Sequence, residues 1–226
     1  MPLLIWGRQK NKTGDLKSII YFAAVYILTN LLLTSTSNVS FFQGQQWNWA
    51  GKGLSFLVGL IFIYITPIFN RKSFCVTTKI NWTETKPLLT ICFIYFLVRV
   101  GLYATSSDAT TSHINIETTL YQATLPGLQE ELIYRGILLG LLNSAFIIPN
   151  FTFLKVNFGI GTIITSLLFG FSHGLIINEN LSFSINYFVL FRTVFDGFLF
   201  ALLTEKTKSI LPSVVFHNGL NLIGQH

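Results

Sequence analysis

Residues 130–148 read EELIYRGILLGLLNSAFII. Two carboxylates and one guanidinium lie in a run that is otherwise apolar and close to the roughly 20 residues that a transmembrane helix needs. A charge at the bilayer centre costs roughly 2.5–3.5 kcal/mol even on the most lenient insertion scale, so ionisable groups in such a run indicate a functional site. Two other apolar runs carry groups of the same kind, in FGFSH at 169–173 and in HNGLN at 217–221.

The composition indicates that lipid surrounds most of the chain. Of the 226 residues, 51% are hydrophobic and only 11% are charged, and the mean hydropathy is +0.57. A soluble domain carries about a quarter charged residues, so the composition excludes that class. The net charge of +6 does not indicate nucleic-acid binding, because the basic residues are scattered over several loops.

Seven apolar runs predict the fold. Six of them are 17 to 21 residues long and the seventh has 14, and they lack the alternation of a barrel strand. The runs are residues 16–34, 53–69, 87–104, 131–148, 157–173, 184–204 and 210–223. We predict an all-α, polytopic transmembrane helical bundle of about seven spans, three in an N-terminal part, 1–105, and four in a catalytic core, 106–226. The longest connection, 105–129, is polar and is expected to cover the outer face.

The basic residues predict the orientation in the membrane. With the N-terminus inside, the inner segments hold eleven of the 15 Lys and Arg residues, and the outer segments hold only Lys52. The first run is longer than the apolar part of a signal peptide and no cleavage pattern follows it, so we expect it to remain as a span. The many Asn, Lys, Ile and Phe residues are typical of an AT-rich genome. We therefore expect an integral protein of a bacterial cell membrane with its N-terminus inside.

The three polar motifs reach the same depth on this topology. Glu130 and Glu131 open the fourth span, and His173 closes the fifth. His217 and Asn221 lie towards the outer end of the seventh span. Because the topology was derived from loop charge alone, this agreement indicates one shared site.

The spacing within the motifs suggests hydrolysis. Glu131 and Arg135 are four residues apart, which suits a carboxylate held by a guanidinium, whereas Glu130 points about 100° away from them. A carboxylate with a histidine partner can take a proton from water. A second histidine and an amide can donate hydrogen bonds to the oxyanion that forms when water attacks a peptide carbonyl.

These motifs resemble the signatures of the CAAX protease and bacteriocin-processing family, also called the Abi family of intramembrane glutamate proteases. The family pattern is a double glutamate followed by arginine, then Phe-x-x-x-His, then His-x-x-x-Asn, and the chain carries EELIYR, FGFSH and HNGLN in that order. The resemblance covers residues 130–221 and implies a metal-independent mechanism without a cofactor. The implied catalytic residues are Glu130, His173, His217 and Asn221, and the supporting ones are Glu131, Arg135 and Phe169.

The resemblance implies an intramembrane endopeptidase. Its substrate would be a small membrane-associated or lipophilic peptide, either of the bacteriocin or pheromone type or prenylated, and its other partner would be the lipid bilayer. Eukaryotic prenyl-protein proteases of this family work on the cytosolic face, whereas the loop charges place the polar cluster at the outer leaflet. Either the chain handles exported peptides, or its topology differs by one span.

Three other functions fit the same residues. A non-catalytic bacteriocin immunity or partner-binding protein could keep the motifs, because a motif does not prove turnover. Intramembrane Glu and His residues also serve proton-coupled transporters, although the sequence shows no two-fold repeat. Two histidines and a glutamate could bind zinc, but H-E-x-x-H is absent and Arg135 would add positive charge, so we expect no metal.

Three arginines lie within the predicted spans, and the sequence suggests an ion-pair partner for two of them. Glu131 and Arg135 could form only an ion pair that fixes helix packing. Arg192 and Asp196 are four residues apart and are predicted to neutralise each other within the sixth span. Arg99 has no partner that the sequence identifies.

Overall fold

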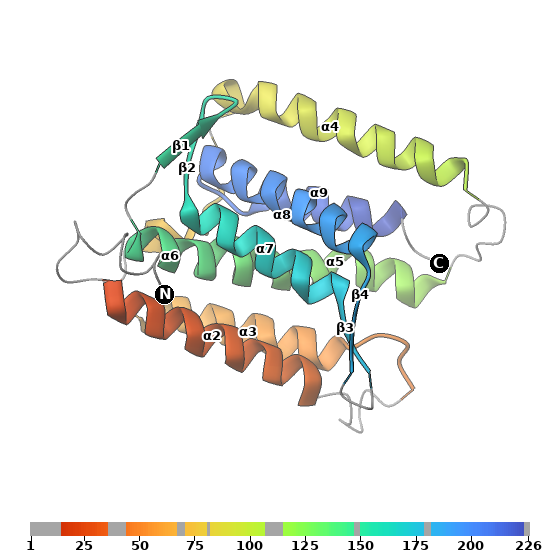
Figure 1. Cartoon of the computed structure of the whole chain (residues 1–226), viewed down its shortest axis with the longest axis horizontal. Coiled ribbons are helices and arrows are strands. Elements are labelled where there is room, and N and C mark those ends of the chain that lie inside the picture. The colour runs from red at the N-terminus through yellow and green to blue at the C-terminus, as the bar shows by residue number, and fades with distance from the viewer. Residues whose placement is uncertain are drawn as a thin grey trace.

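The computed structural model describes residues 15–35, 44–66, 71–80, 82–106, 115–146, 150–178 and 182–223. These residues form a helical bundle with two short β-hairpins (Figure 1). The helices are α2 (Asp15–Ser35), α3 (Trp49–Ile65), the 3-10 helix η3 (Arg71–Phe74), α4 (Trp82–Ala104), α5 (Ile116–Glu131), the π-helix η5 (Leu132–Leu138), α6 (Leu139–Ala145), α7 (Ile160–Gly174), α8 (Tyr187–Thr207) and α9 (Leu211–Ile223). The strands are β1 (Asn150–Phe153) paired with β2 (Val156–Gly159), and β3 (Leu175–Ile177) paired with β4 (Phe183–Ile185).

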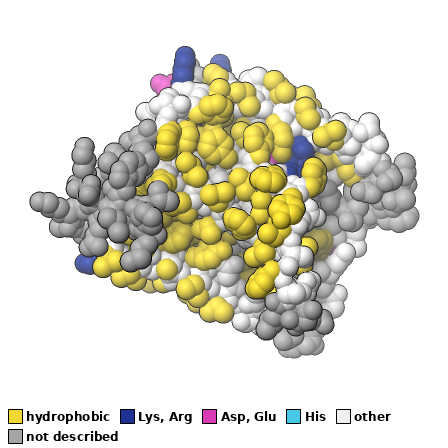
Figure 2. All heavy atoms as spheres, in the orientation of Figure 1, with side chains coloured by type: hydrophobic (Ala, Val, Ile, Leu, Met, Phe, Trp, Pro, Cys, Tyr) yellow, Lys and Arg dark blue, Asp and Glu magenta, His cyan; other side chains and the backbone are white. Residues whose placement is uncertain are grey.

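The prediction of an all-α membrane bundle is confirmed. By length and composition, α2, α4 and α8 can each cross a membrane, and α3 and α7 are shorter apolar helices. Each predicted span contains a helix of the structure, although residues 67–69 and 147–148, at the ends of two spans, lie outside the described residues. Large apolar side chains are exposed while many polar ones are buried, and hydrophobic side chains are spread over the coloured part of the face in Figure 2. This reversal of the usual pattern in water fits helices that face lipid.

The helices are arranged around the segment that carries the two glutamates. Helices α2 and α3 pack on one side of it, and α4 packs against α8 and α9 on the other side (Figure 1). Helices α7 and α8 are closely apposed, because a Cβ atom on Gly174 would lie 2.4 Å from the Cβ atom of Leu190. Small residues allow such close contact between helix backbones in membranes. The side chains of α3, α7 and α9 therefore converge on α5 and η5.

The prediction that residues 105–129 form a polar connection is wrong for residues 116–129, which belong to α5, whereas residues 107–114 lie outside the described residues. Asn115 caps this helix, with its side-chain oxygen accepting a hydrogen bond from the Thr118 N–H at 3.0 Å. The polar residues of α5 suggested a loop, but several of them are satisfied inside the protein. Gln129, for example, is buried and donates a hydrogen bond to the Ser55 hydroxyl at 2.8 Å. Glu130 and Glu131 consequently lie within a continuous helical segment and not at the start of one.

This long segment changes its winding next to the glutamates. The seven residues of η5 form a π-helix, a feature that occurs frequently at functional sites. One turn before Glu130, Pro126 interrupts the hydrogen bonding of α5, because proline has no N–H and its ring crowds the preceding turn. The side chain of Asn218 on α9 accepts a hydrogen bond from the Gly127 N–H at 2.8 Å and donates one to the Thr124 carbonyl at 3.1 Å. Helix α9 is thereby fixed against α5 beside the candidate site.

Candidate active site

The three motifs meet around the carboxylate of Glu130. Its Oε2 atom lies 3.7 Å from Nε2 of His173 and 3.7 Å from Nε2 of His217. These side chains come from α5, α7 and α9, and Glu130 is buried. At 3.7 Å the groups are too far apart for good direct hydrogen bonds, but one water molecule can contact the carboxylate and an imidazole together.

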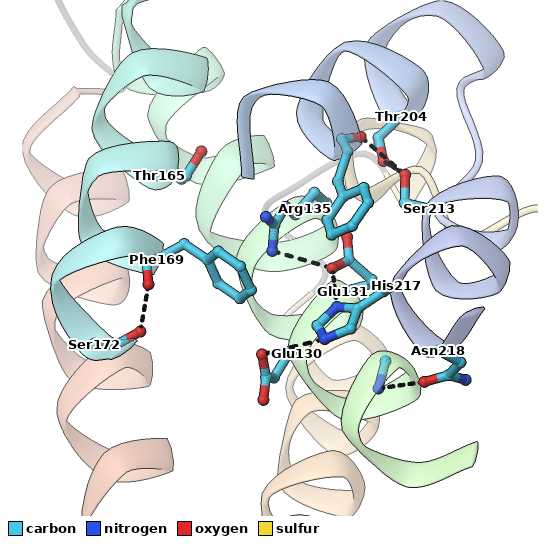
Figure 3. A network of polar contacts seen from close by, with 12 residues as sticks. Glu130, Glu131, Arg135, Thr165, Phe169, Ser172, Thr204, Ser213, His217 and Asn218 are labelled. Atoms are coloured by element: carbon cyan, nitrogen blue, oxygen red, sulfur yellow. Dashed lines mark hydrogen bonds and ion pairs between the residues drawn. The ribbon is translucent and has the colours of Figure 1, made fainter. Parts of the chain in front are cut away.

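Glu131 and Arg135 form the ion pair that their spacing predicts, and this pair also orients His217 (Figure 3). The Glu131 Oε1 atom is 3.1 Å from an Arg135 nitrogen and 2.8 Å from Nδ1 of His217. Because the ion-paired carboxylate can only accept, Nδ1 of His217 carries the proton that it donates. The opposite ring atom, Nε2, therefore faces Glu130. The pair therefore connects the α5–η5 segment with α9 through His217 and sets the ring orientation of a candidate catalytic residue.

The ring of Phe169, on α7, contacts both Arg135 and His173. The centre of its ring is 4.2 Å from the guanidinium carbon of Arg135 and 4.5 Å from the centre of the His173 ring. Arg135 is fully buried and also lies near the rings of Tyr134 and Phe200. Aromatic faces attract a cation most strongly where water is excluded. Phe169 thus connects the buried ion pair with the histidine on α7.

His173 is positioned by the end of α7. Its Nδ1 atom is 2.8 Å from the Phe169 carbonyl oxygen, to which it donates a hydrogen bond, and this leaves Nε2 directed towards Glu130. Helix α7 ends at Gly174, whose carbonyl accepts a hydrogen bond from the Asn186 N–H at 2.9 Å. The β3–β4 hairpin then returns the chain to α8. His173 is more open than the other two residues, with 37% of its side chain exposed.

Lys52 on α3 is a site residue that was not predicted from the sequence. Its ammonium forms an ion pair with Oε1 of Glu130, the carboxylate oxygen that does not face the histidines. In the sequence, Lys52 served only as a marker of topology. The signal that could have identified it was its position as the single basic residue of the predicted outer segments, in a helix that is otherwise apolar.

Asn221, with Arg192 and Asp196 of α8, lines a cavity of about 210 Å³ next to the histidines. Asn221 has no hydrogen bond within the described ranges, so its amide remains available. The predicted pairing of Arg192 with Asp196 is wrong. Asp196 instead accepts a hydrogen bond from the Tyr95 hydroxyl at 2.5 Å and lies 3.4 Å from an Arg99 nitrogen, both on α4. Arg99 thereby gains the partner that the sequence did not identify.

A second cavity lies on the Glu130 side of His173. It is also about 210 Å³ and is lined by Lys52, Glu130, Tyr134 and Ser172 among other residues. His173 lines both cavities, so its imidazole lies between them. Among the residues that the structure describes, no group of three or more His, Cys, Asp or Glu side chains has the arrangement of a metal site.

The fold and the site together define a polytopic helical membrane protein in which two imidazoles, one buried and one exposed, lie beside a buried carboxylate. Residues 113–223 match the family model described as type II CAAX prenyl endopeptidase Rce1-like, so this segment of the chain is similar to that family. All three motifs lie inside the matched segment, whereas Lys52 lies outside it. The family implies a peptide-bond hydrolase of the CAAX-type intramembrane protease class. No curated protein and no solved structure matches the chain.

Proposed function

We propose that this protein is an intramembrane endopeptidase in which Glu130 activates water without the help of a metal. The observation that supports this most directly is the position of the Glu130 Oε2 atom. It is buried, it has no hydrogen-bond partner within the described residues, and it lies 3.7 Å from Nε2 of two histidines. An acceptor in this position can bind a water molecule and take its proton.

The proposed reaction needs only groups of this chain and one water molecule. Glu130 takes a proton from water, and the water oxygen attacks the carbonyl carbon of the scissile bond. His173 orients the water, because its Nε2 atom is free to accept a hydrogen bond. The tetrahedral intermediate then collapses, the C–N bond breaks, and Glu130 returns the proton to the leaving amine.

His217 and Asn221 are proposed to stabilise the oxyanion. Because Nδ1 of His217 donates to Glu131, Nε2 can donate to an oxyanion only when the ring is the doubly protonated imidazolium. The Asn221 amide lines the same cavity and supplies a second donor. Removing one such donor typically slows hydrolysis by about 10²–10³. Glu131, Arg135 and Phe169 are proposed to hold this arrangement in place.

The proposed substrate is a small lipophilic or membrane-associated peptide, of the bacteriocin or pheromone type or prenylated. The apolar outer surface of the bundle allows such a peptide to approach through the lipid. We further propose that the protein lies in a bacterial cell membrane with its N-terminus inside. On that topology the site faces the outer leaflet and would act on exported peptides.

Purified protein in liposomes is expected to cleave a quenched lipophilic peptide over many turnovers and to release new amino termini. A strong chelator is expected to leave the rate unchanged, because no step requires a metal ion. Stoichiometric peptide binding without new amino termini would instead favour the immunity or partner-binding function. Loss of activity in the chelator that zinc restores would contradict the proposed mechanism.

The substitution Lys52→Met is expected to lower kcat with a smaller effect on KM. The ammonium of Lys52 holds one oxygen of Glu130, and loss of this contact lets the base move away from the water. Small misplacements of catalytic groups cost up to about 100-fold in rate. Lys52→Arg should retain more activity, and Lys79→Met, at an exposed lysine, should match the wild type. Full activity of Lys52→Met would show that the ion pair has no catalytic role.

A further inference from the structure

The cavity beside His217 and Asn221 contains a positive charge without a matching negative one. Its charged lining residues are Arg99, Arg192 and Asp196. Asp196 is already engaged by Arg99 and by the Tyr95 hydroxyl. Arg192 forms no hydrogen bond or ion pair within the described part of the chain, and its Nε atom is buried without a partner. Its guanidinium lies near the ring of Phe188, whose centre is 5.7 Å away.

An unpaired guanidinium is unfavourable at this position. Arg192 lies in α8, a helix long and apolar enough to cross the membrane, and its side chain is half-buried. Ionisable residues in such helices are costly and usually have a partner or a functional role. A guanidinium binds a carboxylate through two parallel hydrogen bonds, which also fixes the orientation of the bound group. The charge of this cavity therefore matches an anionic ligand.

The place of the cavity indicates where that anion comes from. The same cavity is lined by His173, His217 and Asn221, three of the four residues proposed to act on the scissile bond. The fourth, Glu130, lines the neighbouring cavity, which shares His173. With a volume of about 210 Å³, it is smaller than the roughly 300–1,000 Å³ of pockets that hold whole small-molecule ligands. A group bound here is thus a small part of a molecule that also reaches the reacting centre.

We propose that Arg192 binds a carboxylate of the substrate peptide, within a few residues of the scissile bond. This inference rests on the proposed function and adds a specificity-determining residue to it. The carboxylate is either the free C-terminus of the peptide or an Asp or Glu side chain. Because Asp196 neutralises Arg99, Arg192 is the residue that supplies the charge.

Binding of three dansylated lipophilic peptides of one sequence tests the proposal: a C-terminal acid, the C-terminal amide, and the amide with one Asp near its end. Wild-type protein in detergent is expected to bind a carboxylate-bearing peptide on the order of 10- to 100-fold more tightly than the plain amide. This difference is the usual contribution of one hydrogen-bonded contact between charged groups. Tighter binding of the acid identifies the C-terminus, and tighter binding of the Asp peptide identifies a side chain.

Arg192→Gln is expected to abolish this preference, so that the carboxylate-bearing peptides and the plain amide bind with similar affinity. Arg192→Lys should keep part of it, because the charge remains and the planar fork is lost. Lys86→Gln, at an exposed lysine on α4, is the matched control and should bind like the wild type. Equal binding of all three peptides by the wild type, or an unchanged preference in Arg192→Gln, would overturn the proposal.

Two further measurements distinguish a substrate carboxylate from a lipid headgroup, and peptide binding from peptide cleavage. If Arg192→Gln weakens binding of phosphatidylglycerol to the protein in detergent but leaves the peptide preference intact, the anion is a lipid headgroup and the proposal fails. Cleavage of the same peptides is measured separately in liposomes. A protein that prefers the carboxylate peptides through Arg192 but cleaves none of them supports the binding site and contradicts the proposed peptidase. A protein that cleaves acid and amide peptides equally well, without any binding preference, supports the peptidase and contradicts the carboxylate site.

Discussion

Replacing Glu130 by Gln is expected to lower kcat for peptide hydrolysis by about 10²–10⁴, the usual contribution of a general base. Glutamine keeps the volume of the side chain and its hydrogen-bonding capacity towards Lys52, but it cannot take a proton from water. The rate is measured in liposomes with a quenched lipophilic peptide, and the amount of folded protein is determined in the same samples. Normal protein levels with lost turnover would identify Glu130 as a group that acts in the reaction.

Glu84→Gln is the matched control for this substitution. Glu84 lies on α4 with 69% of its side chain exposed, and its ion-pair partner, Lys206, is 3.2 Å away. Exposed ion pairs contribute little to stability, so this variant is expected to have wild-type activity. A Glu130→Gln protein that hydrolyses the peptide as fast as Glu84→Gln would disprove the glutamate mechanism. Such a result would favour the binding or immunity function for the same fold.

Replacing Arg135 by Met is expected to produce the largest loss of stability. The side chains of Arg135 and Glu131 are both 0% exposed. Removal of one partner of a buried ion pair leaves an uncompensated charge and typically costs about 3–5 kcal/mol. For a chain of this size the midpoint of thermal unfolding in detergent should fall by about 6–20 °C. The aromatic rings around Arg135 would also lose the cation that they contact.

The double variant Glu131→Gln with Arg135→Met separates charge from packing. Glutamine can still accept the hydrogen bond from His217, and both charges of the buried pair are removed. We expect the double variant to recover most of the lost thermal stability, because pairs in direct contact are not additive. A double variant as unstable as Arg135→Met alone would mean that the volume and ring contacts of Arg135 matter more than its charge.

Much of the candidate site could be predicted from the sequence because its signals are local. The spacing of Glu131 and Arg135 predicted an ion pair, and the structure contains it. Loop charge and motif position predicted that Glu130, His173 and His217 lie at the same depth, and the three side chains meet. The roles assigned to these residues, and the division of the chain at residue 105, stay predictions.

The errors arose where polar residues have partners far away in the sequence. Residues 105–129 were interpreted as a connection because their polar groups suggested contact with water, whereas Gln129 lies in α5 and donates a hydrogen bond to Ser55 on another helix. Arg192 and Asp196 have the spacing of an ion pair, but the carboxylate of Asp196 forms its ion pair with Arg99 on α4. Spacing shows which side chains share a helical face, and it does not show which neighbouring helix faces them.

The sequence by itself determined the membrane class, the helical spans and the three motifs. These follow from the polarity of short segments and from the cost of placing charge in lipid, which do not depend on how the helices are packed. Only the tertiary structure placed Lys52 on Glu130, used Asn218 to fix α9 against α5, and left Arg192 without a partner beside the histidines in the described part of the chain. Contacts of this kind depend on the relative position and rotation of whole helices, which are set by packing between distant segments.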